Sequence, residues 1–339
     1  MKSKNISAVH SNNFDFIRII AALAVLYSHH FALTAQMEPS FFGLHSLGGA
    51  AVLVFFVVSG YLVTASWYND PNIFRFAWRR ALRIWPALTL VVACTAFILG
   101  PIVTSLPLQD YFTHRATYDY FHILRMNIVF VLPGVFENNP YPLGVNGSLW
   151  TIPLEVRCYI VLAALGLFGL LKNKYIFLGS IVAYMIWFTL KSSADIYQKI
   201  HYAREFSAFF LAGAGLFALK EHWQKKPRVV LALCIIIATI LWSIGWRYMA
   251  AWVFVPYAII FFGTSNTRII NQFGRWGDPS YGIYLIAYPI QQTVIKYLWP
   301  SWGFWETMAI SALITVCLAY LSWNYIEKWF LKFKPKRKK

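Results

Sequence analysis

The sequence has little charge, and its few cysteines follow no recognisable spacing. Only 13% of the 339 residues are charged, with 13 Asp and Glu in total, whereas about a quarter of an ordinary soluble domain is charged. This scarcity excludes a soluble globule, a secreted domain and a disordered chain as first interpretations. The four cysteines all fall in apolar stretches, so we expect neither a disulfide framework nor a metal site; they are Cys94, Cys158, Cys234 and Cys317.

Long apolar runs dominate the chain instead. Hydrophobic residues make up 59% of it, and ten apolar stretches lie at about 14–33, 47–66, 84–105, 149–171, 175–190, 205–219, 229–244, 250–264, 280–299 and 306–326. Most are near the ~20 residues that a helix needs to cross a bilayer. The sequence therefore predicts an all-α polytopic membrane protein with about ten transmembrane helices. No small-residue cleavage site follows the first run, so we expect it to be retained as a span.

The basic residues are distributed unevenly between the two sides of these predicted spans. With the N-terminus placed inside, 21 of the 30 Lys and Arg residues fall in cytoplasmic segments, six fall outside and three lie within spans. This asymmetry follows the positive-inside rule and predicts that both termini are cytoplasmic. Topology thus explains most of the net charge of +17, and no nucleic-acid partner is expected. The predicted organisation is a cytoplasmic tail at 1–13, a ten-span membrane domain at 14–326 with a long outer loop at about 106–148, and a basic cytoplasmic tail at 327–339.

Ionisable side chains inside a predicted span are costly and are therefore candidate functional residues. The first span carries Asp15, Arg18 and His29, with His30 as a weaker candidate on another face. Arg18 and His29 are about 16.5 Å apart along a helix and share one face. Asp15 lies three residues before Arg18 and can pair with it. The alternative is an arginine that reaches the lipid headgroups and a hydrogen-bonded structural histidine.

Two further segments carry candidate residues. Arg79, Arg80 and Arg83 precede the third span, and guanidinium groups suit phosphate oxygens, although topology and contact with lipid headgroups would also explain this cluster. Glu155 lies about a turn and a half inside the fourth span, where a carboxylate needs a partner, which we expect on another helix. Weaker candidates are aromatic residues near these spans, for which packing is the common role; they are Trp150, Tyr281 and Tyr284.

Taken in order, these segments resemble the acyltransferase-3 family of integral membrane acyltransferases. The resemblance covers about residues 12–330 and rests on four elements: Arg18 and His29 in the first span, the run at 54–62, the arginine cluster that ends in Arg83-Ile84-Trp85-Pro86, and the segment from Ser148 to Glu155 and Tyr159. The sequence departs from the family at Ala287, where many members have a histidine. A single-domain member is expected, without the C-terminal extracellular esterase-like domain of other members.

The resemblance implies transfer of an acyl group, usually acetyl from acetyl-CoA, to a hydroxyl of a cell-surface or lipid-linked glycan. We expect His29 to act as general base, with Arg18 stabilising charge and Glu155 orienting a polar group; an acyl-histidine intermediate is the alternative. The arginines of the cluster would hold CoA phosphates, and substrate contacts are expected at Asp15, Trp150, Tyr281 and Tyr284. The expected partners are acyl-CoA as co-substrate, the glycan and membrane lipids, in the bacterial inner membrane. A transporter or flippase of lipid-linked sugars, which has no use for CoA, is the alternative function.

Overall fold

The computed structural model describes residues 12–192, 202–267 and 270–335, and these fold almost entirely as helices. Each of the ten predicted apolar stretches coincides with a helix. These helices are α1 (Phe14–Leu33), α2 (Leu47–Asn69), α3 (Ile73–Cys94), α7 (Ile152–Leu167), α8 (Lys174–Ser192), α9 (Tyr202–Ala218), α11 (Pro227–Ser243), α12 (Arg247–Thr264), α13 (Ser280–Leu298) and α14 (Phe304–Ser322). The predicted all-α class is therefore confirmed.

Not all of these helices meet the requirements for crossing a bilayer. Among the described residues, six helical segments are long and apolar enough to span it, namely 14–33, 47–69, 73–103, 147–167, 247–264 and 304–333, and the helices at 174–188 and 227–243 are shorter. The protein is thus a multi-pass membrane protein. The count of ten spans and the side on which the termini lie stay predictions. The tail predicted at 1–13 lies almost wholly outside the described residues, as do residues 336–339 of the C-terminal tail.

Two long helices continue through single π-helical turns. The π-helix η1 (Thr95–Leu99) joins α3 to α4 (Gly100–Val103), and the π-helix η6 (Trp323–Glu327) joins α14 to α15 (Lys328–Phe330) and η7 (Leu331–Phe333). The helical structure therefore extends past residue 326, where the basic tail was predicted to begin. The added residue in each turn rotates the side chains that follow it, and η6 ends at the buried Glu327.

The remaining segments are short. They are β1 (Ser40–Phe41), which pairs antiparallel with β2 (His45–Ser46), the helices α5 (Leu108–Thr113), α6 (Arg115–Asp119) and α10 (Lys220–Trp223), and the 3-10 turns η2 (Tyr120–Arg125), η3 (Gly147–Thr151), η4 (Leu170–Lys172) and η5 (Ile270–Trp276). The long loop is ordered against the bundle: the Tyr111 hydroxyl donates to the Ala96 carbonyl at 2.7 Å, and the Asn146 amide donates to the Leu285 carbonyl at 2.8 Å.

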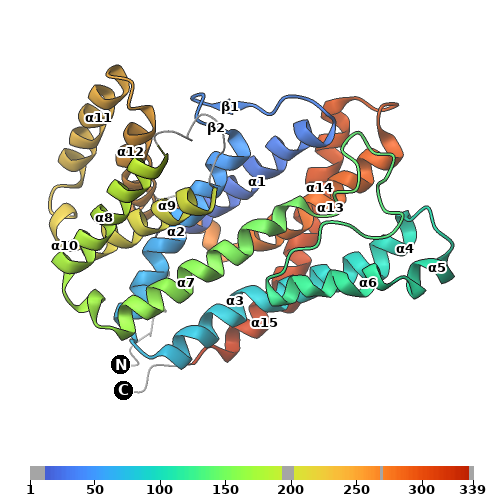
Figure 1. Ribbon diagram of the computed structural model, residues 1–339, viewed down its shortest axis with the longest axis horizontal. Coiled ribbons are helices and arrows are strands. Elements are labelled where there is room, and N and C mark those ends of the chain that lie inside the picture. The colour runs from blue at the N-terminus through green and yellow to red at the C-terminus, as the bar shows by residue number, and fades with distance from the viewer. Residues whose placement is uncertain (1–11, 193–201, 268–269, 336–339) are drawn as a thin grey trace, which may run out of the picture.

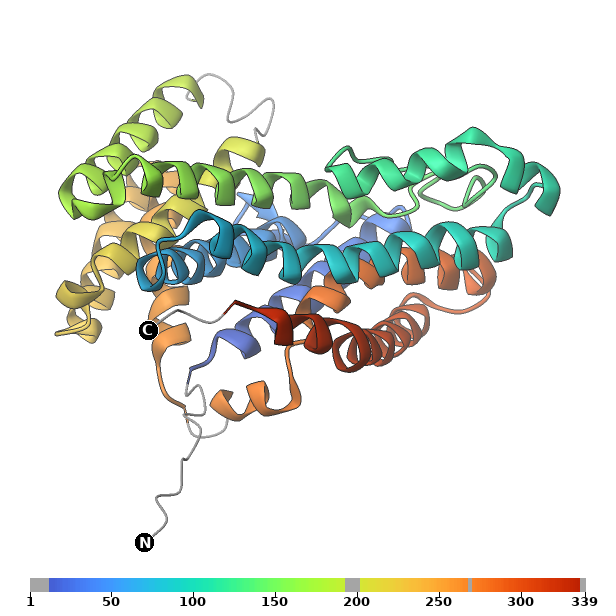
Figure 2. The ribbon, with the colours of Figure 1, turned by 90° about the horizontal axis from the view of Figure 1, so that it is seen from below.

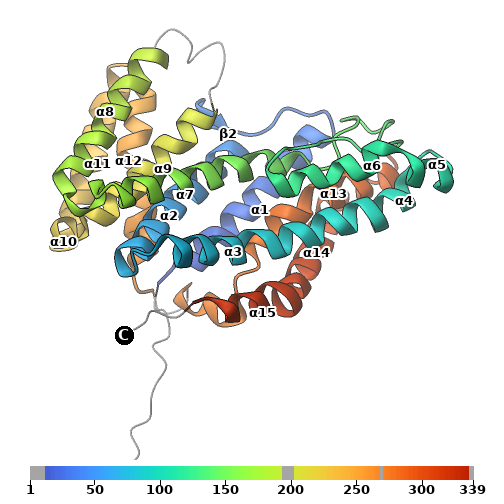
Figure 3. The same cartoon turned by 60° about the horizontal axis from the view of Figure 1, so that its bottom comes forward.

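The helices pack around an interior that α1, α2 and α3 share with α7 and α13. Figure 1 shows α1, α2, α3 and α7 at a slant along the long axis, with α8, α11 and α12 at one end and α4 to α6 at the other. Figure 2 and Figure 3 show α3 between α7 and the C-terminal helices α14 and α15. The closest packing joins α2 to α9, where a Cβ on Gly60 would lie 1.9 Å from the Phe210 carbonyl oxygen. Small residues permit this approach of two backbones.

Candidate active site

A polar cavity of about 130 Å³ lies where α1, α2, α3, α7 and α13 meet. Arginines, a glutamate and hydroxyl groups from all five helices line it beside apolar side chains. Its polar lining residues are Arg18, Ser59, Arg80, Arg83, Thr151, Glu155, Tyr159, Ser280, Tyr281 and Tyr284. A charged group inside a membrane bundle is stable only when it has a partner. The contacts that each arginine makes within the protein therefore indicate whether it is available to a ligand.

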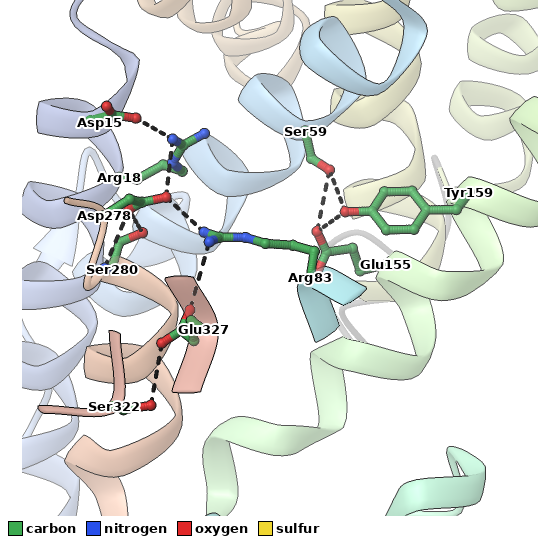
Figure 4. A network of polar contacts seen from close by, with 10 residues as sticks. All are labelled: Asp15, Arg18, Ser59, Arg83, Glu155, Tyr159, Asp278, Ser280, Ser322 and Glu327. Carbon is green, nitrogen blue, oxygen red and sulfur yellow. Dashed lines mark hydrogen bonds and ion pairs between the residues drawn. The ribbon is translucent and has the colours of Figure 1, made fainter. Parts of the chain in front are cut away.

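Two of these arginines share one carboxylate, that of Asp278. Arg83 donates to Asp278 at 2.7 Å, and a nitrogen of Arg18 lies 3.1 Å from the same carboxylate oxygen. Arg18 also pairs with Asp15, one turn earlier on α1, and Arg83 lies 3.7 Å from Glu327. Figure 4 shows Arg83 reaching from α3 towards Asp278 and Glu327. The network ties α1, α3, α13 and η6 together at the end of the bundle where α1 and α13 begin.

The anion at the centre of this network stays charged over a wide pH range. Burial by itself raises the pKa of the Asp278 carboxyl, but the charges of Arg18 and Arg83 and the hydrogen bonds from Ser280 outweigh it and lower the pKa to about 2. The Ser280 hydroxyl donates to Asp278 at 2.5 Å as α13 begins. Asp278 therefore positions two guanidinium groups at the cavity wall and fixes the start of α13.

Arg80 is bound differently from its neighbours. Its guanidinium lies over the rings of Tyr159, at 5.8 Å, and Phe76, at 5.9 Å, and its buried Nε has no hydrogen-bond partner. Glu155 provides an opposite charge nearby. An arginine at a cavity wall whose hydrogen-bonding capacity is not used within the protein is suited to an anionic ligand.

Glu155 has a hydrogen-bond partner on another helix and a second partner on its own helix. It accepts a hydrogen bond from the Ser59 hydroxyl of α2 at 3.2 Å and another from the Tyr159 hydroxyl one turn along α7. Ser59 and Tyr159 are themselves 3.0 Å apart, oxygen to oxygen. Figure 4 shows this trio on the opposite side of Arg83 from Asp278.

Tyr281 and Tyr284 both line the cavity, as predicted for a site on α13. The Tyr281 ring lies 5.6 Å from the Arg83 guanidinium, and the Tyr284 hydroxyl donates to the Ser148 carbonyl at 2.9 Å. Tyr288 follows one turn later, so that the three tyrosines occupy one side of α13. This row leads from the cavity towards the other end of α1.

His29 lies beyond that row and is not part of the cavity lining. Its ring meets Tyr288 edge to face at 5.4 Å, and its buried Nδ1 has no hydrogen-bond partner among the residues that the structure describes. Glu38 is near enough to act on it electrostatically. His30, by contrast, is fully buried and contacts Thr307 at 3.1 Å and Gln291 at 3.3 Å. His29 is thus the histidine with an uncommitted nitrogen, and His30 is a packing residue.

Three other predicted residues lie outside the cavity. Arg79 donates to Asp70 at 2.7 Å, and Arg75 donates to the same carboxylate at 2.8 Å and 2.6 Å, while Asn72 caps the start of α3. These contacts hold the pKa of Asp70 well below its usual range.

The other two residues outside the cavity lining are Trp150 and Asp15. The Trp150 ring packs on Phe206 at 5.6 Å, and Asp15 contacts Arg18, which does line the cavity.

Sequence reasoning missed Asp278, Glu327 and Ser59. A signal existed for the two carboxylates: acidic residues number only 13, and Asp278 precedes a predicted span that begins with Ser280 and Tyr281. Glu327 was assigned to a tail, and only the π-helical turn η6 directs it inward. Within the described parts of the chain, no cluster of His, Cys, Asp or Glu is arranged to hold a metal ion.

Comparison with known proteins places the chain in a family. The model of the acyltransferase domain that defines the acyltransferase-3 family matches residues 11–324. The chain is 34% identical to the O-acetyl transferase of Shigella phage Sf6, over 95% of this chain and 96% of that protein. It is 26% identical to nodulation protein 10 of Rhizobium leguminosarum bv. viciae, over 97% of this chain and 95% of that protein. It is 25% identical to peptidoglycan O-acetyltransferase OatA of Listeria monocytogenes, over 93% of this chain and 55% of that protein. No solved structure matches the chain.

Proposed function

The chain belongs to the acyltransferase-3 family of integral membrane acyltransferases, and on that premise we propose that it moves acetyl from cytoplasmic acetyl-CoA to a glycan hydroxyl. The acceptor is a cell-surface or lipid-linked glycan of the O-antigen or exopolysaccharide type, and the enzyme lies in the bacterial inner membrane. Two relatives whose names specify O-acetyl transfer support the acetyl group, and one of these names specifies peptidoglycan. The basic residues at the end where α1 begins support a cytoplasmic position for the cavity.

The cavity is the observation that carries this proposal. It brings Arg18, Arg80 and Arg83, from two helices, to one wall, beside a glutamate that is held by Ser59 of α2. Acyl-CoA is polyanionic, and guanidinium groups bind phosphate in bidentate geometry. Arg80 makes the first contact with phosphate because, among the described residues, no carboxylate lies within ion-pair distance of it, whereas Arg18 and Arg83 are paired. Arg18 and Arg83 keep their carboxylates and contribute positive potential.

The transfer step requires a base at the far end of the tyrosine row. The thioester extends from the arginines along Tyr281, Tyr284 and Tyr288 towards His29. His29 accepts the proton of the glycan hydroxyl as its oxygen forms a bond to the thioester carbonyl carbon. The carbon–sulfur bond breaks, and CoA leaves as the thiolate, which then takes up a proton. The uncommitted Nδ1 of His29 is consistent with this role.

The proposal is tested with purified protein in proteoliposomes, radiolabelled acetyl-CoA and lipid-linked glycan from the host membrane. We expect release of CoA thiol and a glycan heavier by one acetyl group. Arg80→Gln should raise the KM for acetyl-CoA by about tenfold, the loss of one charge-assisted contact, and Arg79→Gln, whose arginine is bound to Asp70, should change it by less than about twofold. Glycan that crosses the bilayer without consumption of acetyl-CoA would instead establish the flippase.

A further inference from the structure

A second cavity, of about 430 Å³, lies on another side of α1 and opens between α1, α2, α9 and α12. We name it the lateral groove. Its lining is almost entirely aliphatic and aromatic and includes Ala24 of α1, Ala51 of α2 and Ala258 of α12, with His45, Glu205 and Tyr248 as its polar members. Alanines on three helices make the space.

An apolar space of this size is not left empty in a membrane. Protein interiors pack as densely as organic crystals, and an apolar cavity of even ~150 Å³ stays dry and takes up an apolar guest. The lateral groove is larger and has an opening, so a hydrocarbon chain from the bilayer is able to enter it.

One end of the lateral groove is polar. His45, in the β1–β2 hairpin, lies 2.5 Å from Glu205 of α9, and both side chains are nearly inaccessible to solvent. The Tyr248 hydroxyl, at the start of α12, is close enough to Glu205 to interact with it. A buried pair of this kind offers hydrogen-bond partners to a polar headgroup.

Positive charge adjoins the same end. Arg204 precedes Glu205 and lies 5.3 Å from the Trp187 ring, and Arg247 precedes Tyr248 and lies 5.4 Å from the Trp242 ring. Trp242 in turn contacts Phe42 of the hairpin at 6.0 Å. These cations complement a phosphate at the end of a lipid.

The polar end is connected to the region of His29. The loop that carries His45 also carries Glu38, which accepts a hydrogen bond from Ser28, the neighbour of His29. A Cβ on Gly48 would lie 3.0 Å from Ser28, so the start of α2 is packed against this part of α1. A headgroup at His45 therefore lies at the same end of α1 as the proposed base.

We propose that the lateral groove binds the hydrocarbon chain of a phosphate-linked glycolipid acceptor, with its headgroup at His45 and Glu205. The proposal rests on the proposed function and specifies how the acceptor is delivered: the chain lies along one side of α1 and presents its sugar to His29. The acceptor and acyl-CoA then approach α1 from different sides.

A third cavity provides a matched control. It has about 460 Å³ and is lined by apolar side chains of α3, η1, α13 and α14, with no carboxylate, histidine or basic residue among the described residues that line it. We name it the control groove. If any apolar space sufficed for the lipid, both grooves would bind it.

The test uses two photoreactive polyprenyl phosphates, one labelled near the phosphate and one at the far end of the chain. With the purified protein in detergent micelles, we expect the first to crosslink near His45 or at 203–210 and 245–250, and the second to crosslink α1 at 16–24 or α12 at 255–262. Ala24→Leu combined with Ala258→Leu fills the lateral groove and should reduce crosslinking at least fivefold without lowering the melting temperature. Cys94→Leu combined with Ile290→Phe fills the control groove and should leave crosslinking unchanged.

Three results would overturn the proposal. They are crosslinks confined to the control groove, undiminished crosslinking in the filled variant, and equal competition by phosphatidylglycerol, which would identify a site for bulk lipid. Because crosslinking needs no acetyl transfer, its outcome is independent of the proposed function. Specific crosslinking without acetyl transfer would support lipid binding in the lateral groove and refute the proposed transferase. Acetyl transfer to lipid-linked glycan at the wild-type rate by the filled variant would support the transferase and refute lipid binding in the lateral groove.

Discussion

Asp278 and Asp70 form a comparable pair of carboxylates, because each binds two arginines, and only the arginines bound by Asp278 line the cavity. Asp278 binds Arg18 and Arg83, and Asp70 binds Arg75 and Arg79. Their side chains are 9% and 7% exposed. Removing one partner of a buried ion pair costs ~3 kcal/mol or more. Asp278→Asn should therefore destabilise the fold strongly, and Asp70→Asn should do so less because its partner Arg75 is 30% exposed; thermal unfolding in detergent measures both.

Their effects on catalysis should differ. Asp278→Asn releases two guanidinium groups from the cavity wall, and misplacing charges that stabilise a reacting group costs on the order of 100-fold in rate. Per folded molecule, kcat/KM for acetyl transfer should fall by about that factor in Asp278→Asn and by less than about threefold in Asp70→Asn. Asp278→Glu should recover part of the activity, since the carboxylate is retained. Equal kcat/KM per folded molecule in the two asparagine variants would refute a role for Asp278 in positioning the arginines of the cavity.

The pH dependence provides an independent check. The folded-state pKa of Asp278, about 2, lies below its ordinary value of 3.8. The stabilisation is therefore complete above about pH 4 and is lost as the pH falls towards 2. Wild-type unfolding should show this acid-dependent loss, and Asp278→Asn should show less of it.

Two further predictions concern the surroundings of His29. His29→Ala should lower kcat by ~100-fold or more, while calorimetry should show that it still binds acetyl-CoA. His30→Ala should lower the free energy of unfolding by ~1–3 kcal/mol but retain the activity per folded molecule. Gly147→Ala places a Cβ 2.5 Å from the Tyr288 ring and should lower kcat by displacing that ring from His29, while Gly179→Ala, which meets nothing within 4 Å, should leave kcat unchanged.

The candidate site shows where local reasoning succeeds and where it stops. Arg18 and Glu155 could be selected from the sequence because a charge in an apolar run is costly wherever the run packs, and Arg83 could be selected because it belongs to a cluster of arginines. The different roles of Arg79 and Arg80 could not be predicted from the sequence. Adjacent residues on a helix point about 100° apart, and the position of Asp70 in the folded protein decides that Arg79 is the one that it binds. Glu327 was assigned to a tail because one π-helical turn, which composition does not reveal, changes its direction.

The sequence by itself determined that the protein folds in a lipid bilayer and that its fold is all-α. Apolar runs near 20 residues long can satisfy their backbone only as helices in a bilayer, and basic residues on one side bias the orientation. Tertiary structure alone decided which charges meet. Arg18, Arg83 and Asp278 come from segments 65 to 260 residues apart in the chain, and helix packing alone brings them within ion-pair distance. The lateral groove also depends on tertiary structure, because only the packing of four helices decides whether their side chains leave a space between them.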